Sequence, residues 1–160
     1  FETFINPGHP IPNYIQELTG ISNSMVEQSP SISTVLPALF AFLGSHQETV
    51  LVAQNAPFDL SFLTFAARAH GFDWPKYPVL DTAIIARKVL SRDEVPNCKL
   101  GTLAEFFGTQ TTPNHRALDD ARATVDVFHG LLERLGSHDI YTLEELNNFG
   151  KKVKKQKSPE

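Results

Sequence analysis

Short apolar runs alternate along this chain with longer segments of helical periodicity. Thr49–Ala53 and Val79–Leu80 are brief, apolar and bounded by turn-forming residues, which predicts buried strands. Phe1–Ile5 alternates apolar and polar residues before a turn signal at Asn6-Pro7-Gly8, so a strand is predicted there as well. Strands that alternate with helices predict an α/β layered domain.

Capping residues and glycines mark where the predicted helices begin and end. Pro57 suits the first turn of one helix, Ser31 or Ser33 can cap another, and Pro37 lies awkwardly inside the latter. Five segments of helical pattern are followed by a glycine, at Gly20, Gly44, Gly71, Gly108 and Gly136. The predicted segments cover residues 11–20, 22–26, 31–43, 57–70, 82–90, 100–107, 116–135 and 141–149.

Charge is distributed unevenly over the 160 residues. The net charge is −4, but five of the 14 Lys and Arg residues and one of the 18 Asp and Glu residues lie in 151–160, which leaves 9 basic and 17 acidic residues in 1–150. An acidic body argues against a duplex-DNA binder, whose contact surface is a basic stripe. The polar end predicts a helical linker and basic tail over 137–160, after a folded domain at 1–136.

The cysteine count limits which cross-links and metal sites are possible and indicates the redox state of the compartment. Cys98 is the one cysteine, which excludes an intrachain disulfide and a multi-cysteine zinc site and favours a reducing compartment. No apolar run approaches the roughly 18 residues of a membrane span. We therefore expect a cytoplasmic protein with no membrane partner.

The first candidate constellation is Gln54-Asn55-Ala56-Pro57-Phe58-Asp59, where a predicted strand leads into a helix. Ligands of open α/β sheets bind at the carboxyl ends of strands. Asp59 alone in a first turn is ordinarily a charge that stabilises the helix dipole. Beside the large aromatic Phe58 and the amide Asn55, it also fits a place where a base stacks and a backbone is held.

The second constellation runs from His115 to Asp120, at the start of the long predicted helix. A helical wheel with a core stripe of Leu118, Ala121, Val125, Phe128, Leu132 and Leu135 separates the two acidic residues. Asp119 falls on the solvent face with Arg122 and Asp126. Asp120 falls on the sheet-facing flank with Thr124, Val127 and Leu131. The ordinary alternative is an acidic helix N-terminus with a histidine near its cap.

Together the two constellations give two carboxylates and one histidine at helix N-termini around one sheet. Divalent cations take oxygen ligands, and a histidine can deprotonate a water molecule. This combination suits phosphoryl chemistry that uses metal ions.

These residues resemble the DEDDh 3′–5′ exonucleases, the DnaQ-like family that includes the epsilon subunit of bacterial DNA polymerase III. The opening Asn6-Pro7-Gly8 context and Leu18-Thr19-Gly20-Ile21 look like the third strand of the family and the loop after it. The stretch 54–59 looks like the second exonuclease motif, with Gln54 where His is commoner, and 115–120 looks like the third. The resemblance implies a ribonuclease H-like α/β fold with a mixed sheet flanked by helices.

The resemblance also implies roles. Asp59 and Asp120 would be metal ligands for Mg²⁺ or Mn²⁺ and His115 the general base, which makes these three the catalytic residues. Asn55 and Phe58 would contact the nucleotides at the 3′ end, and Leu18 and Thr19 would line the pocket for the terminal base. The implied enzyme is a 3′–5′ exodeoxyribonuclease of the proofreading or repair type that acts on single-stranded 3′ ends of DNA.

One part of the family pattern is missing. The first motif, Asp-x-Glu-Thr, supplies the other two carboxylates, and no Asp-x-Glu occurs in these 160 residues. We therefore expect an exonuclease domain that is truncated at its N-terminus, lacks the first two strands and holds an incomplete two-metal site. Assayed alone, such a chain should have little or no nuclease activity.

Two alternatives and two partners remain open. The chain could instead be a non-catalytic nucleic-acid or polymerase-binding module, or an RNA-trimming exonuclease of the same family. The segment after Leu135 resembles the linker of actinobacterial proteins that fuse this exonuclease to a UvrC-like GIY-YIG nuclease domain. The expected partners are therefore a DNA polymerase subunit or a fused C-terminal nuclease domain.

Overall fold

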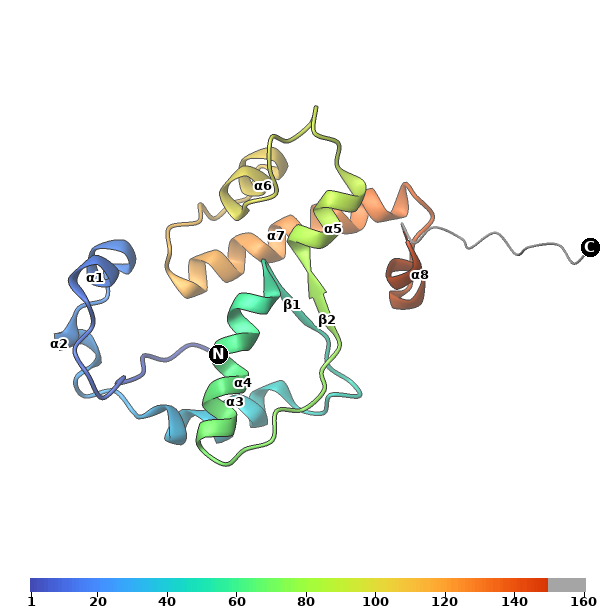
Figure 1. Ribbon diagram of the computed structural model, residues 1–160. Coiled ribbons are helices and arrows are strands. Elements are labelled where there is room, and N and C mark those ends of the chain that lie inside the picture. The colour runs from blue at the N-terminus through green and yellow to red at the C-terminus, as the bar shows by residue number, and fades with distance from the viewer. Residues whose placement is uncertain (150–160) are drawn as a thin grey trace, which may run out of the picture.

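The computed structural model describes residues 1–149, and within them the chain forms two short strands and eight helices (Figure 1). The strands are β1 (Leu51–Ala53) and β2 (Val79–Asp81). The helices are α1 (Asn13–Thr19), α2 (Asn23–Val26), α3 (Ile32–Leu43), α4 (Ala56–Ala69), α5 (Thr82–Val89), α6 (Leu100–Phe107), α7 (Ala117–Gly136) and α8 (Leu143–Asn148). The basic tail predicted at 151–160 lies outside the described residues.

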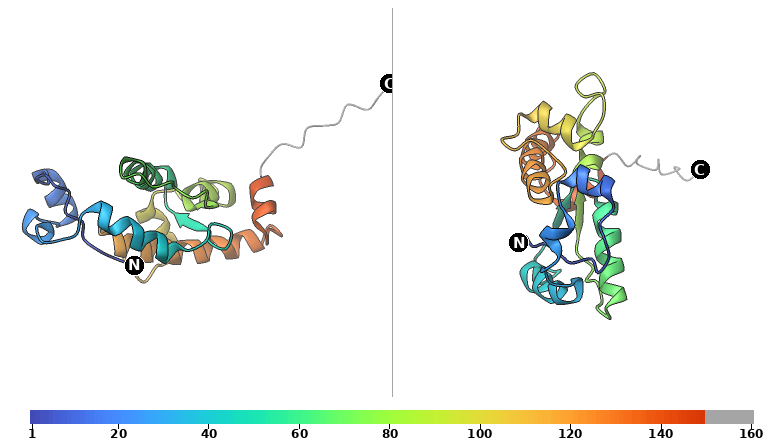
Figure 2. Two further views of the ribbon diagram at one scale, coloured as in Figure 1. Left: turned by 90° about the horizontal axis from the view of Figure 1, so that it is seen from below. Right: turned by 90° about the vertical axis from the view of Figure 1, so that its left-hand side faces the viewer.

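The sheet consists of β1 and β2, which pair in parallel with Leu51 opposite Val79 and Ala53 opposite Asp81. Helix α4 connects the two strands, so both strands end at the same edge. Two views agree that the sheet lies between α4 on one side and α7 on the other (Figure 2). The predicted α/β class is confirmed, and the sheet among the described residues is this parallel pair.

The strand predicted at Phe1–Ile5 is wrong, because this segment has no strand assignment and pairs with neither β1 nor β2. The segment is held by other contacts: the ring of Phe1 lies 5.6 Å from that of Phe42. At the turn that follows, the N–H of Asn6 donates to the carbonyl of Pro30. Alternating polarity predicts a strand only where a neighbouring backbone can accept its hydrogen bonds.

The core lies where α7 packs against α5 and α6. Leu103 of α6 and Val127 and Leu131 of α7 are completely buried there. Gly130 allows the close approach of α6, because a Cβ at that position would overlap the ring of Phe107. Ile140 and Leu146 of the segment around α8 are buried in the same core.

The core stripe predicted for α7 is rotated from the real one. Val125 is 52% exposed and Leu132 is 45% exposed, and Ala121 is exposed too. The buried positions are Ala123, Thr124, Val127, Leu131 and Leu135. α7 carries apolar residues on two flanks, and the flank that contains Thr124, Val127 and Leu131 is the one that α5 and α6 cover. Asp120 lies one turn before Thr124, at the start of this packed flank.

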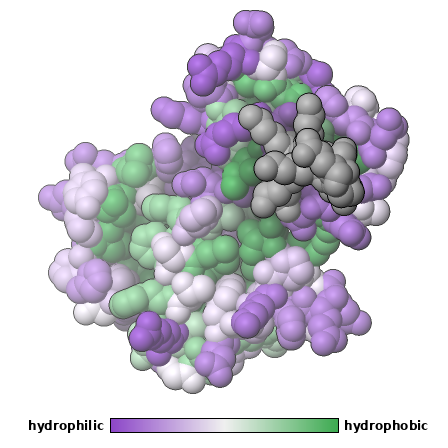
Figure 3. Space-filling view, turned by 45° about the vertical axis from the view of Figure 1, so that its right-hand side comes forward, coloured by the Kyte–Doolittle hydropathy of each residue, from purple (hydrophilic) through white to green (hydrophobic). Residues whose placement is uncertain are grey.

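Several apolar side chains remain on the surface. Figure 3 shows apolar residues gathered at the centre of one face, between polar margins. On α4 the exposed aromatics are Phe58, Phe62 and Phe65, and on β1 Val52 is 37% exposed. Within residues 1–149, none of the helices is long and apolar enough to cross a lipid bilayer.

Candidate functional site

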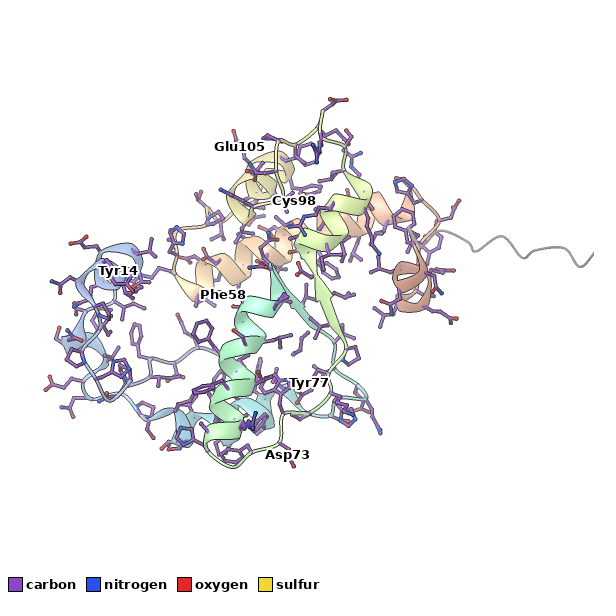
Figure 4. All side chains as sticks on the ribbon, in the orientation of Figure 1. Tyr14, Phe58, Asp73, Tyr77, Cys98 and Glu105 are labelled. Carbon is purple, nitrogen blue, oxygen red and sulfur yellow. The ribbon has the colours of Figure 1, made fainter. Side chains whose placement is uncertain are left out.

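The carboxyl ends of β1 and β2 are joined by side-chain hydrogen bonds. The hydroxyl of Thr82 donates to the side-chain oxygen of Gln54 and to the carbonyl of Ala53. The Nε2 group of Gln54 donates to the carbonyl of Cys98 at 2.8 Å, so a third segment is tied to the same corner (Figure 4 labels Cys98). Gln54 thus connects the end of β1 with the start of α5 and with the loop before α6.

The first predicted constellation forms the turn from β1 into α4. Asn55 is the N-cap of α4 and has a left-handed backbone with φ of 62°. Pro57 follows within the first turn, where its missing N–H costs nothing. Phe58 is 61% exposed at this end of α4 and meets Phe62 edge to face at 5.1 Å (Figure 4). The structure therefore places an exposed aromatic ring beside Asp59.

Asp59 lies in the first turn of α4. Desolvation of its carboxylate by the surrounding protein raises its pKa above the ordinary 3.8, a backbone hydrogen bond opposes the rise, and the charge of Asp81 adds to it. The carboxylates of Asp59 and Asp81 therefore create a negative electrostatic potential at the strand ends. Such a potential attracts cations, and the oxygen donors match the preference of Mg²⁺ and Mn²⁺.

The second predicted constellation lies at the start of α7. The backbone N–H of Asn114 donates to Oδ1 of Asp120 at 3.0 Å, and its Nδ2 group donates to Oδ2 of Asp119 at 2.8 Å. Asp119 also approaches Arg122 at 3.7 Å. Both acidic residues are half-buried. Asp119 thus lies beside Arg122, as the helical wheel predicts, and Asp120 begins the packed flank of the helix.

His115 precedes this helix in a left-handed backbone conformation, with φ of 64°. It is exposed, and within residues 1–149 its imidazole has no hydrogen-bond or ion-pair partner. Positive φ at a residue with a Cβ is uncommon and marks a turn that is held by its surroundings. The imidazole is therefore available for a ligand or a substrate.

The loop after α1 reaches the same end of α7. Arg116 donates from Nη2 to the carbonyl of Gly20 at 3.3 Å. Leu18 is 51% exposed beside this contact, whereas Thr19 is half-buried and donates from its hydroxyl to the carbonyl of Ile15. An apolar cavity of about 410 Å³ opens next to α1, and Thr19 lines it with Ile15 and Ile21. Leu18 does not line this cavity.

The predicted residues therefore form two groups. Asn55, Phe58 and Asp59 gather at the turn into α4, and Leu18, Thr19, His115 and Asp120 gather at the start of α7. No hydrogen bond or ion pair among residues 1–149 joins the two groups. Within those residues, no group of three or more His, Cys, Asp or Glu side chains is close enough to hold a metal ion. The carboxylates fit a divalent cation by donor type but do not form a metal site by themselves.

Sequence reasoning assigned no individual role to three residues that organise these groups: Gln54, Asp81 and Arg116. Asp81 had a usable signal, since an acidic residue between a strand and a helix is a natural N-cap. The sequence signals for Gln54 and Arg116 were weaker, because their contacts with Cys98 and Gly20 depend on segments that are distant along the chain.

The parallel strand pair, its flanking helices and the acidic first turns of α4 and α7 define an α/β domain with carboxylates at its helix N-termini. Residues 1–128 match the family model described as Exonuclease, and the chain belongs to this exonuclease family. The family resemblance that the motifs indicate is thereby confirmed.

Relatives of this chain are bacterial nucleases and polymerases. It is 50% identical over 149 residues to a Mycobacterium tuberculosis protein that carries the name bifunctional exonuclease/endonuclease, with 93% of this chain and 23% of that protein covered. It is 42% identical to the PolC-type DNA polymerase III of Caldanaerobacter subterraneus subsp. tengcongensis, covering 92% of this chain and 10% of that protein. The chain thus spans a small part of these relatives.

A shorter relative and a solved structure are also similar to this chain. The epsilon subunit of DNA polymerase III from Aquifex aeolicus is 35% identical, with 91% of this chain and 72% of that subunit covered. Exonuclease X, solved in complex with 5′ overhanging duplex DNA, shares the fold with a TM-score of 0.64 at 23% identity, covering 91% of this chain and 77% of that one. The fold is therefore the ribonuclease H-like exonuclease fold.

Proposed function

We propose that this chain supplies part of a metal-dependent 3′–5′ exonuclease that removes nucleotides from single-stranded 3′ ends of DNA. The observation that carries the proposal is the position of Asp59 and Asp120 in the first turns of two helices, in a chain that matches the exonuclease family over residues 1–128. The relatives named for DNA polymerase III support DNA as the substrate and the cytoplasm as the location.

Each residue has a proposed role that follows from its place. Asp59 and Asp120 would contribute oxygen ligands to Mg²⁺ or Mn²⁺, which would supply charge neutralisation at the scissile phosphate. His115 would take the proton from the attacking water, since it is exposed and its imidazole has no partner within residues 1–149. Phe58 and Asn55 would hold the last nucleotides, and Leu18 and Thr19 would contact the terminal base. The domain responsible would be 1–136.

The test is release of nucleotides from a 3′-labelled single-stranded DNA by the full-length gene product, with Mg²⁺ and with a chelator. Asp59→Asn and Asp120→Asn should each abolish cleavage, whereas Asp119→Asn, the matched neighbour, should retain it. Loss of activity in Asp119→Asn with retention in Asp120→Asn would reverse the assignment. RNA of the same sequence, assayed in parallel, distinguishes a DNA exonuclease from an RNA-trimming one.

A second candidate function is a non-catalytic nucleic-acid or polymerase-binding module. It is favoured by the small number of metal donors that gather among residues 1–149. On either reading, the 160 residues assayed alone should cleave DNA slowly or not at all, because ligands must be supplied together to offset their desolvation. A DNA polymerase subunit or a fused nuclease domain would then be the partner. Cleavage by the full-length gene product decides between the two functions.

A further inference from the structure

The carboxylate of Asp81 joins two helix N-termini. Its Oδ1 atom accepts hydrogen bonds from the backbone N–H groups of Ala83 at 2.9 Å and Ile84 at 3.4 Å, which are the first turn of α5. The same side chain accepts from the N–H of Asn55 at Oδ1 and from the N–H of Ala56 at Oδ2, both at 3.1 Å. Asn55 and Ala56 lie at the start of α4, more than twenty positions away along the chain.

These contacts go beyond ordinary capping. The first N–H groups of a helix have no partner within the helix, and one side chain usually serves its own helix only. Here a single acidic residue serves α5, which follows it, and α4, which precedes β2. Parallel pairing makes this possible, since Ala53 lies opposite Asp81 and the turn after β1 therefore passes over the Asp81 side chain.

The turn that Asp81 contacts is the one that places the candidate site. Asn55 adopts a left-handed backbone with φ of 62°, a conformation that surrounding contacts must maintain. Phe58 and Asp59 follow within the first turn of α4. The direction in which both side chains leave the helix depends on how this turn is fixed against β2.

We propose that Asp81 is a positioning residue, which holds the start of α4 against the end of β2 and so orients Asp59 and Phe58 without touching the nucleic acid. The inference rests on the function proposed above for the site. It predicts different roles for two neighbouring acidic residues. Asp59 contacts metal or substrate, and Asp81 accepts hydrogen bonds from backbone N–H groups. Charge on Asp81 strengthens each of those hydrogen bonds.

The informative substitution is Asp81→Ser. Serine caps helices about as well as aspartate, so α5 keeps its cap, but the shorter side chain cannot reach Asn55 and Ala56. Asp81→Asn is the intermediate case, because its Oδ1 still accepts while an amide donor replaces Oδ2. Thr142→Ala is the matched control, since it removes the N-cap of α8 far from the site.

Two readouts keep this inference separate from the proposed function. In amide hydrogen exchange of the 160-residue chain, Asp81→Ser should expose the Asn55 and Ala56 amides while the Ala83 amide stays protected. In the full-length gene product with Mg²⁺, the kcat of Asp81→Ser should fall roughly 10- to 100-fold, the scale of a small misplacement of reacting groups. The kcat of Asp81→Asn should fall less, and Thr142→Ala should keep the wild-type kcat.

Each result decides something. Unchanged protection of Asn55 and Ala56 in Asp81→Ser, or an unchanged kcat, overturns the positioning role. Loss of Ala83 protection together with the other amides also overturns it, because Asp81 would then act only as part of the general fold. If the wild-type gene product cleaves no DNA, the proposed function fails, and the amide exchange alone then decides whether Asp81 positions the start of α4.

Discussion

Arg116 and Gly20, 96 positions apart in the chain, are joined by a hydrogen bond from the guanidinium to the carbonyl oxygen. Gly20 has a left-handed backbone with φ of 66°, and a Cβ there would lie 3.2 Å from Nη2 of Arg116. Glycine thus serves both the backbone conformation and the close approach of the arginine. The contact brings the end of α1, which carries Leu18 and Thr19, to the start of the helix that follows His115.

We expect Arg116→Ala to weaken binding of single-stranded DNA, because the end of α1 would no longer be held beside His115. The loss should be roughly fivefold, the equivalent of about 1 kcal/mol for one hydrogen bond. Fluorescence anisotropy of a 3′-labelled oligonucleotide measures it. Arg122→Ala is the control, since it removes the same charge near the start of α7 without a contact to Gly20. Equal losses in both variants would show that charge alone matters.

His115→Ala should lower the turnover of the full-length gene product far more than its affinity for DNA. A general base acts in the chemical step and contributes about 10²- to 10⁴-fold to the rate. Single-turnover kinetics and anisotropy on the same oligonucleotide separate the two quantities. His129→Ala, an exposed histidine further along α7, should leave both unchanged. Comparable losses in rate and affinity would argue against the base role.

The sequence was sufficient where the determinants are local. The bounds of α6 agree with prediction because a polar loop precedes Leu100 and Gly108 follows Phe107, and both signals act within a turn of the helix ends. The turn from β1 into α4 was also predictable, since Pro57 and Asp59 are typical first-turn residues.

The sequence was insufficient where the structure depends on packing or pairing with segments that are distant along the chain. Phe1–Ile5 has the alternation of a strand but no backbone to pair with among the described residues. For α7, Val125 and Val127 lie on different flanks of one helix, and only packing against α5 and α6 decides that Val127 is buried. The contact of Asp81 with Asn55 requires the register of β1 on β2, which local patterns do not encode.

Gly130→Ala should destabilise the domain although alanine favours helices. The new methyl group would overlap the Phe107 ring, and overpacking of a tight core costs about 1–3 kcal/mol. Urea denaturation followed by circular dichroism measures the change. Gly101→Ala in α6 is the control: nothing lies within 4 Å of its Cβ position, so a gain of about 0.5–1 kcal/mol is expected. Destabilisation by both would indicate a different cause.

Asp59→Asn should stabilise the metal-free domain at neutral pH. The pKa of Asp59 is raised above 3.8, chiefly by desolvation and also by the charge of Asp81, so the folded state holds its proton more tightly than the unfolded state. The contribution of this group to the free energy of unfolding therefore falls as the pH rises from 3.8 through the higher pKa of the folded state. At neutral pH this contribution stays lower. Asparagine removes the charge that causes the loss.

Chemical denaturation in chelator, at a series of pH values, tests this relation. The advantage of Asp59→Asn should be present at pH 7 and disappear as the pH falls below 3.8, where the wild-type carboxyl becomes protonated in both states. Asp73→Asn, an exposed loop residue, should show no such dependence. Together with loss of DNA cleavage in the same variant, a gain in stability would identify Asp59 as a charge that the fold tolerates for function. A variant less stable than wild type at pH 7 would instead make Asp59 a structural residue of α4.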